Sequence, residues 1–197
     1  MNVWRDRLHR WLGPLARRCP LSPNAITLLA LALSAVAAWL LYSRHFLVAI
    51  VIVAMAGLAD AFDGIVARVQ NKASRFGDFL DHFADRVSDV LLVIGWLLGN
   101  HVRVEITVAV VAAVLLNGYI GTQIEATWQE RSYDTVGRGE FVLALIVYPI
   151  VSHILDRLGQ EDLWLGDYLV TEWMALPMLL FAIVGIVQRL IRAARLA

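Results

Sequence analysis

The sequence predicts an all-α integral membrane protein with six transmembrane helices, preceded by an amphipathic helix in the membrane interface. Two observations carry this prediction. Hydrophobic residues make up 59% of the 197 residues and charged residues only 17%, more apolar surface than the core of one soluble domain buries. The apolar residues also gather in runs of roughly 20, the length that crosses the ~30 Å hydrocarbon layer of a bilayer.

Residues 1–20 are expected to form the interfacial helix. Arginines alternate there, at helical spacing, with the hydrophobic residues Val3, Trp4, Leu8, Trp11, Leu12 and Leu15. A helix of this pattern lies in the membrane plane and points its arginines toward anionic headgroups. We do not expect a signal peptide, because the polar lead is long and the next apolar run has full span length.

Residues 21–197 are expected to form one transmembrane domain. Its apolar runs cover residues 25–43, 46–68, 79–99, 104–127, 139–156 and 172–191. Prolines inside the last two runs, Pro149 and Pro177, are expected to kink them. The single cysteine, Cys19, excludes an internal disulfide and a cysteine-based zinc site.

The distribution of basic residues predicts the orientation in the membrane. With the N-terminus in the cytoplasm, the outer side receives only Arg44, Arg103 and Arg157, together with an acidic loop after the fifth span. The inner side receives Arg5, Arg7, Arg10, Arg17, Arg18, Arg68, Lys72, Arg75, Arg86, Arg131, Arg138, Arg189, Arg192 and Arg195. An excess of arginine and lysine marks the cytoplasmic side. Both termini are therefore expected there.

Aspartates at the end of the second span and the start of the third point to function. Asp60 and Asp63 are three residues apart, and Asp81, Asp85 and Asp89 follow at steps of four, so each set shares one helix face. Carboxylates gathered at a membrane edge need a cation, and hard oxygen ligands suit magnesium, manganese or calcium. The spacing therefore predicts a metal site at the cytoplasmic face.

Phosphate chemistry accounts for the register of these residues. Two metal ions that bridge a pyrophosphate need carboxylates from at least two rigid elements. Asp60, Asp63 and Asp81 can bind metal while Asp85 takes a proton, and Arg68 and Arg75 are placed to meet phosphate oxygens. Carboxylates merely solvated at helix ends would need no such fixed register.

The stretch from Asp60 to Asp85 resembles the signature of the CDP-alcohol phosphatidyltransferases. That signature reads D-x-x-D-G-x-x-A-R, eight residues, then G-x-x-x-D-x-x-x-D, and every defined position is matched. Ser22-Pro23-Asn24-x-x-Thr27 resembles a second element that the family carries before its first span. The six-span count and the N-terminal interfacial helix are similar as well.

This resemblance implies an enzyme that moves a phosphatidyl-type group from a CDP-linked lipid to an alcohol and releases CMP. It implies two Mg²⁺ or Mn²⁺ ions on Asp60, Asp63, Asp81 and Asp85, with Asp85 also the general base. The implied CDP-binding residues are Asn24, Thr27, Asp60, Gly64, Ala67, Arg68 and Gly77. The expected partners are the lipid donor, a small alcohol, membrane lipids and a second copy of the chain, but no nucleic acid.

The acceptor alcohol is less sharply indicated. Asp85-Arg86-x-Ser88-Asp89 resembles the branch that uses inositol phosphate, including the archaetidylinositol-phosphate synthases. Candidate acceptor residues are Arg75, Gln123, Glu125, Arg131 and Arg138: arginines would hold a phosphate, whereas Gln123, where that branch has an arginine, and Glu125 would suit the hydroxyls of a neutral polyol. Inositol or inositol phosphate is favoured, with glycerol phosphate, serine, ethanolamine or another polyol open.

Two other classes of function remain as alternatives. A small cation transporter would also carry acidic residues inside the membrane, but it would distribute them across the bilayer rather than at one face. A catalytically silent family member would act only as a membrane partner, yet the signature here is intact.

Overall fold

The computed structural model describes residues 12–129 and 138–196. After a helical segment at residues 12–18 come α2 (Pro23–Tyr42), α3 (Phe46–Val69), α4 (Arg75–Gly99), α5 (Val104–Trp128), α6 (Arg138–Arg157) and α7 (Val170–Leu196). Between α6 and α7 lies an antiparallel hairpin of β1 (Trp164–Leu165) and β2 (Tyr168–Leu169), in which Trp164 faces Leu169. The all-α prediction is confirmed apart from this hairpin.

Helices occupy all six places where the sequence predicts spans. Four of them, α2, α3, α5 and α7, are long and apolar enough to cross a membrane within the described residues. The other two, α4 and α6, carry charged residues in their first turns. The chain is therefore a helical membrane protein, with four spans identified by length and composition.

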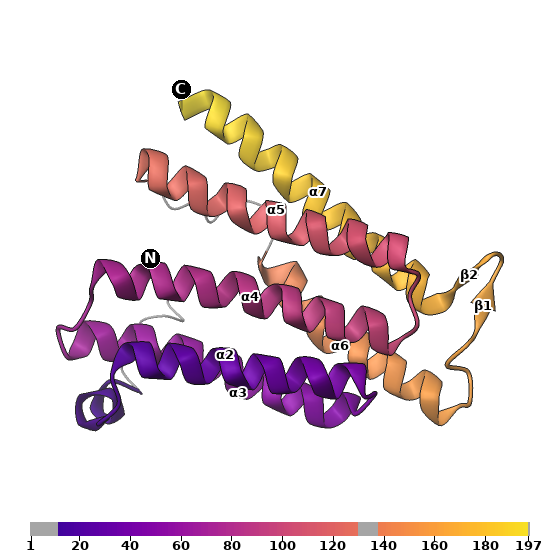
Figure 1. Ribbon diagram of the computed structural model, residues 1–197, viewed down its shortest axis with the longest axis horizontal. Helices are drawn as coiled ribbons and strands as arrows, with labels where there is room; N and C mark the ends of the chain where they lie inside the picture. Colours follow the sequence, from indigo (N-terminus) through magenta and orange to yellow (C-terminus); the bar gives the residue numbers. More distant parts are fainter. Residues whose placement is uncertain (1–11, 130–137, 197) are drawn as a thin grey trace.

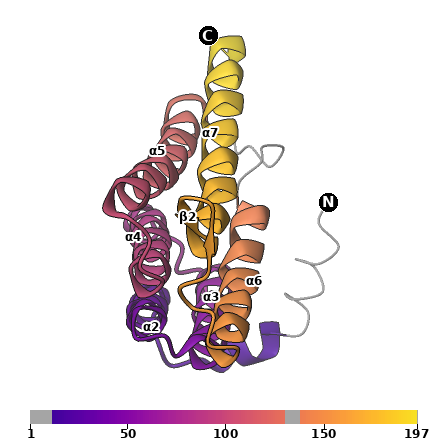
Figure 2. The same ribbon diagram turned by 90° about the vertical axis from the view of Figure 1, so that its right-hand side faces the viewer.

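The helices run roughly along one direction, with α4 in the middle of the bundle (Figure 1). Seen from the end in Figure 2, α2 and α3 lie on one side of α4, and α5 and α7 lie on the other. Helix α2 packs against both α3 and α4, α5 packs against α4 and α7, and α6 packs against α3. The end of α3 and the starts of α2 and α4 consequently meet at one end of the molecule.

Serines begin two of these helices. Ser22 caps α2, where its Oγ accepts a hydrogen bond from the backbone N–H of Ala25 at 3.3 Å. Ser74 caps α4, where its Oγ accepts from the N–H of Gly77 at 3.0 Å. Such caps satisfy N–H groups that have no partner inside the helix. Because of its cap, α4 begins at Arg75, four residues before the apolar run that the sequence shows.

Glycines bring α2 and α4 into backbone contact. A Cβ at Gly95 would lie 2.3 Å from the carbonyl oxygen of Ala38, and one at Gly99 would lie 2.4 Å from that of Leu41. Small residues at four-residue spacing permit this approach between membrane helices. The fully buried side chains of Trp96 and Leu97 lie in the core beside this contact.

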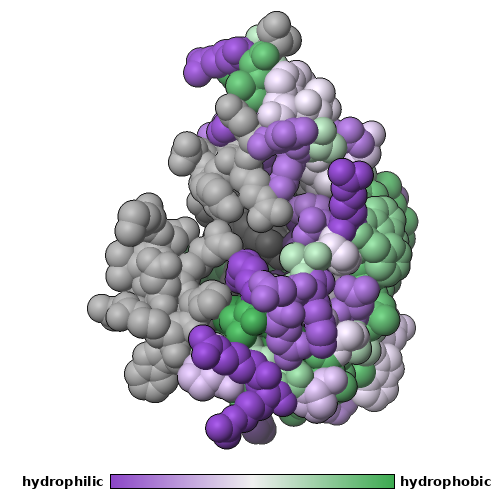
Figure 3. Space-filling model, turned by 90° about the vertical axis from the view of Figure 1, so that its left-hand side faces the viewer, coloured by the Kyte–Doolittle hydropathy of each residue, from purple (hydrophilic) through white to green (hydrophobic). Residues whose placement is uncertain are grey.

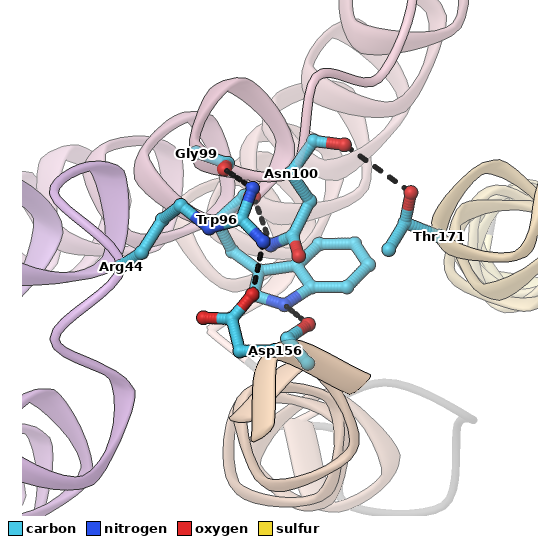
Figure 4. A network of polar contacts seen from close by, with 7 residues as sticks. Arg44, Trp96, Gly99, Asn100, Asp156 and Thr171 are labelled. Atoms are coloured by element: carbon cyan, nitrogen blue, oxygen red, sulfur yellow. Dashed lines mark hydrogen bonds and ion pairs between the residues drawn. The ribbon is translucent and has the colours of Figure 1, made fainter. Parts of the chain in front are cut away.

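Polar contacts hold the helices together at the end where the hairpin lies (Figure 4). Arg44, between α2 and α3, forms an ion pair with Asp156 of α6. Trp96 Nε1 donates to Ser152 Oγ at 3.1 Å, and Thr171 Oγ1 donates to the carbonyl of Asn100 at 3.2 Å. The hydrogen bonds therefore connect α4 to α6 and to α7.

A buried carboxylate adds to this network at the same end. Glu172, in the first turn of α7, is 1% exposed. Its Oε1 accepts from Arg103 Nε at 2.8 Å and from the Arg103 backbone N–H at 3.1 Å. Its Oε2 accepts from the N–H of Leu169 at 3.0 Å. Glu172 thus joins the start of α5, the hairpin and α7.

Candidate metal and nucleotide site

Three of the predicted aspartates converge between α3 and α4. One carboxylate oxygen each from Asp60, Asp63 and Asp81 lies within 4.8 Å of the others. Asp63 is buried, and Asp60 and Asp81 are half-buried. The donor set is all oxygen and comes from two helices held by α2, which suits a hard divalent cation. The residues present therefore fit the metal that the sequence predicts.

Thr27 of α2 touches this group directly. Its Oγ1 donates to Asp63 Oδ2 at 2.5 Å, and the same hydroxyl lies 3.1 Å from the carbonyl of Pro23. Thr27 and Asp63 are both 5% exposed. Since the hydroxyl contacts a carboxylate of the group, Thr27 orients Asp63, a role that the sequence did not suggest.

The remaining predicted CDP-binding residues surround the same end of the bundle. The side-chain oxygen of Asn24 would lie 3.3 Å from a Cβ built at Gly77, so the starts of α2 and α4 meet closely there. Likewise, a Cβ at Gly64 would lie 3.6 Å from the guanidinium of Arg68. Arg68 is exposed and Ala67 is half-buried. The structure therefore brings the predicted nucleotide residues to one place.

Asp85 lies one turn beyond Asp81 and is 9% exposed. Among the described residues, the convergent group contains three carboxylates, and Asp85 is outside it. Asp85 Oδ2 instead lies 3.6 Å from Nη2 of Arg86, whose Nη1 lies 3.2 Å from Asp89 Oδ2. The predicted base and Asp89 thus share one guanidinium.

Arg86 rests against a glycine of α5. A Cβ at Gly118 would lie 2.3 Å from Arg86 Nη1 and 2.6 Å from its Cδ. Only a residue without a side chain leaves room for the guanidinium in this position. Gly118 therefore sets where the Arg86 charge lies relative to Asp85.

A second arginine reaches the same turn of α5 from α7. Arg189 Nη1 donates to Asn117 Oδ1 at 2.6 Å and also to the Asn117 backbone carbonyl. Its guanidinium lies over Gly121, where a Cβ would be 3.1 Å from Cζ. The sequence interpretation of Arg189 as a cytoplasmic anchor missed this placement. Two glycines three residues apart within an apolar run were the available signal.

The predicted acceptor residues are less closely grouped. Arg75 and Gln123 are exposed, and Glu125 is half-buried. Arg131 and the side chain of Arg138 lie outside the described residues. Viewed from this end in Figure 3, hydrophilic side chains gather over the described face, with hydrophobic surface to one side. That pattern is typical of a membrane protein end that meets water.

The helical bundle and its carboxylate group define a membrane protein with a candidate site for a divalent cation. The chain belongs to the CDP-alcohol phosphatidyltransferase family, whose model matches residues 20–184. It therefore transfers a phosphatidyl-type group from a CDP-linked lipid to an alcohol and releases CMP. Membership in this transferase family favours a transferase over the cation transporter that the sequence left open.

Two named relatives cover most of the chain. The archaetidylinositol phosphate synthase of Pyrococcus horikoshii is 32% identical over 150 residues, which is 76% of this chain and 78% of that one. The phosphatidylinositol phosphate synthase of Corynebacterium glutamicum is 27% identical over 130 residues, which is 64% of this chain and 59% of that one.

A solved structure shares the fold. The phosphatidylinositol phosphate synthase of Mycobacterium tuberculosis with CDP-DAG bound superposes with a TM-score of 0.65 at 22% identity, covering 98% of this chain and 92% of that one. A complex of the same enzyme with manganese and citrate gives the same TM-score. At this identity the likeness establishes the arrangement of helices.

Proposed function

We propose that the acceptor of this transferase is an inositol phosphate. The observation that carries the proposal is a pair of guanidinium groups against neighbouring glycines of α5. Arg86, which lies beside Asp85, contacts Gly118, and Arg189 contacts Gly121. Two arginines match the charge and geometry of a phosphate. The archaetidylinositol and phosphatidylinositol phosphate synthases among the relatives support the same acceptor.

The donor side of the proposal uses the convergent aspartates. Asp60, Asp63 and Asp81 would hold Mg²⁺ or Mn²⁺, and Asp85, outside this group, would serve the proton transfer. Bound metal supplies positive charge to the pyrophosphate of the donor. The CDP group would then lie over Gly64, Ala67, Arg68 and Gly77, with Asn24 and Thr27 beside it. Small residues on that face leave room for the nucleotide.

In the proposed reaction, Asp85 is the general base. Its carboxylate accepts the proton of the acceptor hydroxyl. The acceptor oxygen then forms a bond to the phosphorus that carries the lipid. The bond from that phosphorus to the oxygen of the CMP phosphate breaks, and CMP leaves with the electron pair. Arg86 holds the carboxylate in place beside Asp89.

We further propose the membrane arrangement that the sequence predicts. All six long helices would cross the bilayer, with both termini and the aspartates on the cytoplasmic side. Two of the three arginines assigned to the outer side, Arg44 and Arg103, pair with Asp156 and Glu172 at the opposite end from the aspartates, which supports this orientation. The enzyme would act as a homodimer, with residues 1–20 lying on the membrane surface.

CMP release by the purified protein tests the acceptor. CDP-diacylglycerol and magnesium would be supplied with inositol 1-phosphate, inositol, glycerol 3-phosphate, serine or ethanolamine. We expect release with inositol 1-phosphate and a rise of about tenfold in its KM for Arg189→Gln. Arg195→Gln, which changes an exposed arginine of the same helix, is the matched control and should leave KM unchanged.

Other outcomes discriminate between acceptors. Turnover with inositol but not with its phosphate would overturn the proposal in favour of a neutral polyol. Turnover with glycerol 3-phosphate alone would agree with a phosphate site formed by the two arginines, but it would exclude inositol phosphate as the acceptor. An ether-linked CDP-lipid run in parallel identifies the lipid tail.

A further inference from the structure

The side chain of Gln70 joins the catalytic bundle to the helical segment at residues 12–18. Gln70 follows the last residue of α3. Its Nε2 donates to the carbonyl of Ala16 at 2.8 Å and to the carbonyl of Cys19 at 2.9 Å. A glutamine amide has two N–H donors, so both are used in this contact. The bonds connect parts of the chain more than 50 residues apart.

These carbonyls lie where the helical segment ends. The last carbonyls of a helix lack their usual partner within it. The carbonyl of Ala16 accepts from the Cys19 N–H at 3.3 Å, and Gln70 adds a donor from another part of the chain. The contact is also packed: Ala16 is fully buried and clusters with Ile26, Ile65 and Val66. The segment therefore docks on α3 and does not rest on lipid alone.

The docked segment leads directly into the site. Only Pro20–Pro23 separate Cys19 from Asn24, and so short a stretch spans at most roughly 18 Å even when extended. Thr27, one turn after Asn24, is hydrogen-bonded to Asp63. The chain between residues 19 and 27 is thus fixed to α3 at both ends, at Gln70 and at Asp63. Asn24 lies between these two attachments.

We propose that Gln70 is a positioning residue for the CDP-lipid donor. By holding the end of the N-terminal segment, it keeps the 19–24 stretch, and with it Asn24, against the nucleotide side of the site. This rests on the assignment of Asn24 and Thr27 to the donor in the proposed function. Loss of the amide donors then weakens donor binding while the aspartates and the chemical step remain.

Two variants of similar length separate hydrogen-bond donation from bulk. Gln70→Met keeps the chain length and removes both donors, whereas Gln70→Lys retains a group that can donate to carbonyls. Gln160→Met, an exposed glutamine at the opposite end, controls for the introduced methionine. Unfolding midpoints of all variants show whether the bundle is intact.

Cys19 provides the first readout, because it is the only cysteine of the chain and its carbonyl is one of the two acceptors. A water-soluble maleimide should label Cys19 about fivefold faster in Gln70→Met than in the parent protein. Gln70→Lys and Gln160→Met should label at the parent rate. Labelling needs no turnover, so it is independent of the acceptor.

Donor binding provides the second readout. The Kd for CDP-diacylglycerol in the presence of magnesium should rise about fivefold in Gln70→Met, with kcat at saturating donor within about twofold of the parent. Unchanged labelling in Gln70→Met would overturn the docking. Faster labelling with unchanged Kd would overturn the positioning role, and a fall in kcat without a change in Kd would do the same. Cys19 labelling and the donor Kd are both measured without the acceptor, so they remain valid tests if inositol phosphate is not the acceptor.

Discussion

The hydroxyl of Thr27 on α2 donates a 2.5 Å hydrogen bond to Oδ2 of Asp63 on α3, and both side chains are 5% exposed. The bond joins two motifs that are 36 residues apart. It holds the Asp63 carboxylate in the group that it forms with Asp60 and Asp81. The short N-terminal motif therefore contacts the three-carboxylate group directly.

Thr27→Val should weaken metal binding without unfolding the protein. Valine has nearly the shape of threonine but cannot donate to Asp63. Loss of a residue that orients a ligand typically costs 10- to 100-fold in metal affinity, so the magnesium concentration for half-maximal CMP release should rise by about that factor. Thr27→Ser retains the hydroxyl and is the control. Equal metal requirements in the Val and Ser variants would contradict this role.

Asp85→Asn should stop transfer but not donor binding. The amide keeps the size of the carboxylate and cannot accept the acceptor proton. General base catalysis contributes about 10²- to 10⁴-fold, and kcat for CMP release should fall within that range. Metal-dependent binding of CDP-diacylglycerol, measured by titration, should remain within about threefold of the parent. Near-normal turnover would exclude Asp85 as the base.

Gly118→Ala should impair the reaction by moving Arg86. The new Cβ would lie 2.3 Å from Arg86 Nη1, so the guanidinium must leave its place beside Asp85 and Asp89. We expect kcat to fall about tenfold, the size of one charge-assisted hydrogen bond. Gly57→Ala, at a helical glycine with nothing within 4 Å of the new Cβ, is the control. Equal activity of the two variants would show that the position of Arg86 is immaterial.

Glu172→Gln should destabilise the fold and leave catalysis intact. The side chain is 1% exposed, and its carboxylate accepts bonds from Arg103 and from the N–H of Leu169. Replacing its charge should cost about 1–3 kcal/mol, measured as a lower unfolding midpoint in detergent. Glu161→Gln, at an exposed position between α6 and α7, should have no effect. A loss of kcat at temperatures where Glu172→Gln is folded would contradict the separation of this end from the site.

The acidic site was largely predictable because its residues are local. Asp60 and Asp63 share one turn of α3, and Asp81 lies on α4, the helix that Ser74 caps. Helical periodicity alone therefore predicts which helix face carries each aspartate. Convergence of the two sets required only that α3 and α4 meet at one end. Asp85 was expected among the metal ligands, but it lies one turn beyond Asp81 and outside the three-carboxylate group.

The contacts that the sequence did not reveal depend on which helix faces meet. Arg189 has the appearance of a membrane anchor, and only the packing of α7 on α5 brings it to Asn117. Gln70 is an unremarkable polar residue until the N-terminal segment folds back on α3. In each case a long side chain reaches another element, which helical periodicity does not encode. Pro149 and Pro177 lie inside α6 and α7, and the kinks expected there stay a prediction.

The contact at Gly95 and Gly99 links substitutions far from the site to the positions of the aspartates. Gly95 is fourteen residues beyond Asp81 on one continuous helix, about 21 Å away along its axis. The Ala38 backbone leaves no space for a side chain at Gly95. A side chain at Gly95 would tilt α4 relative to α2. A tilt at this end of α4 displaces the start of the helix, where Asp81 lies. The spacing of the carboxylates between α3 and α4 therefore depends on a helix contact at the opposite end of the bundle.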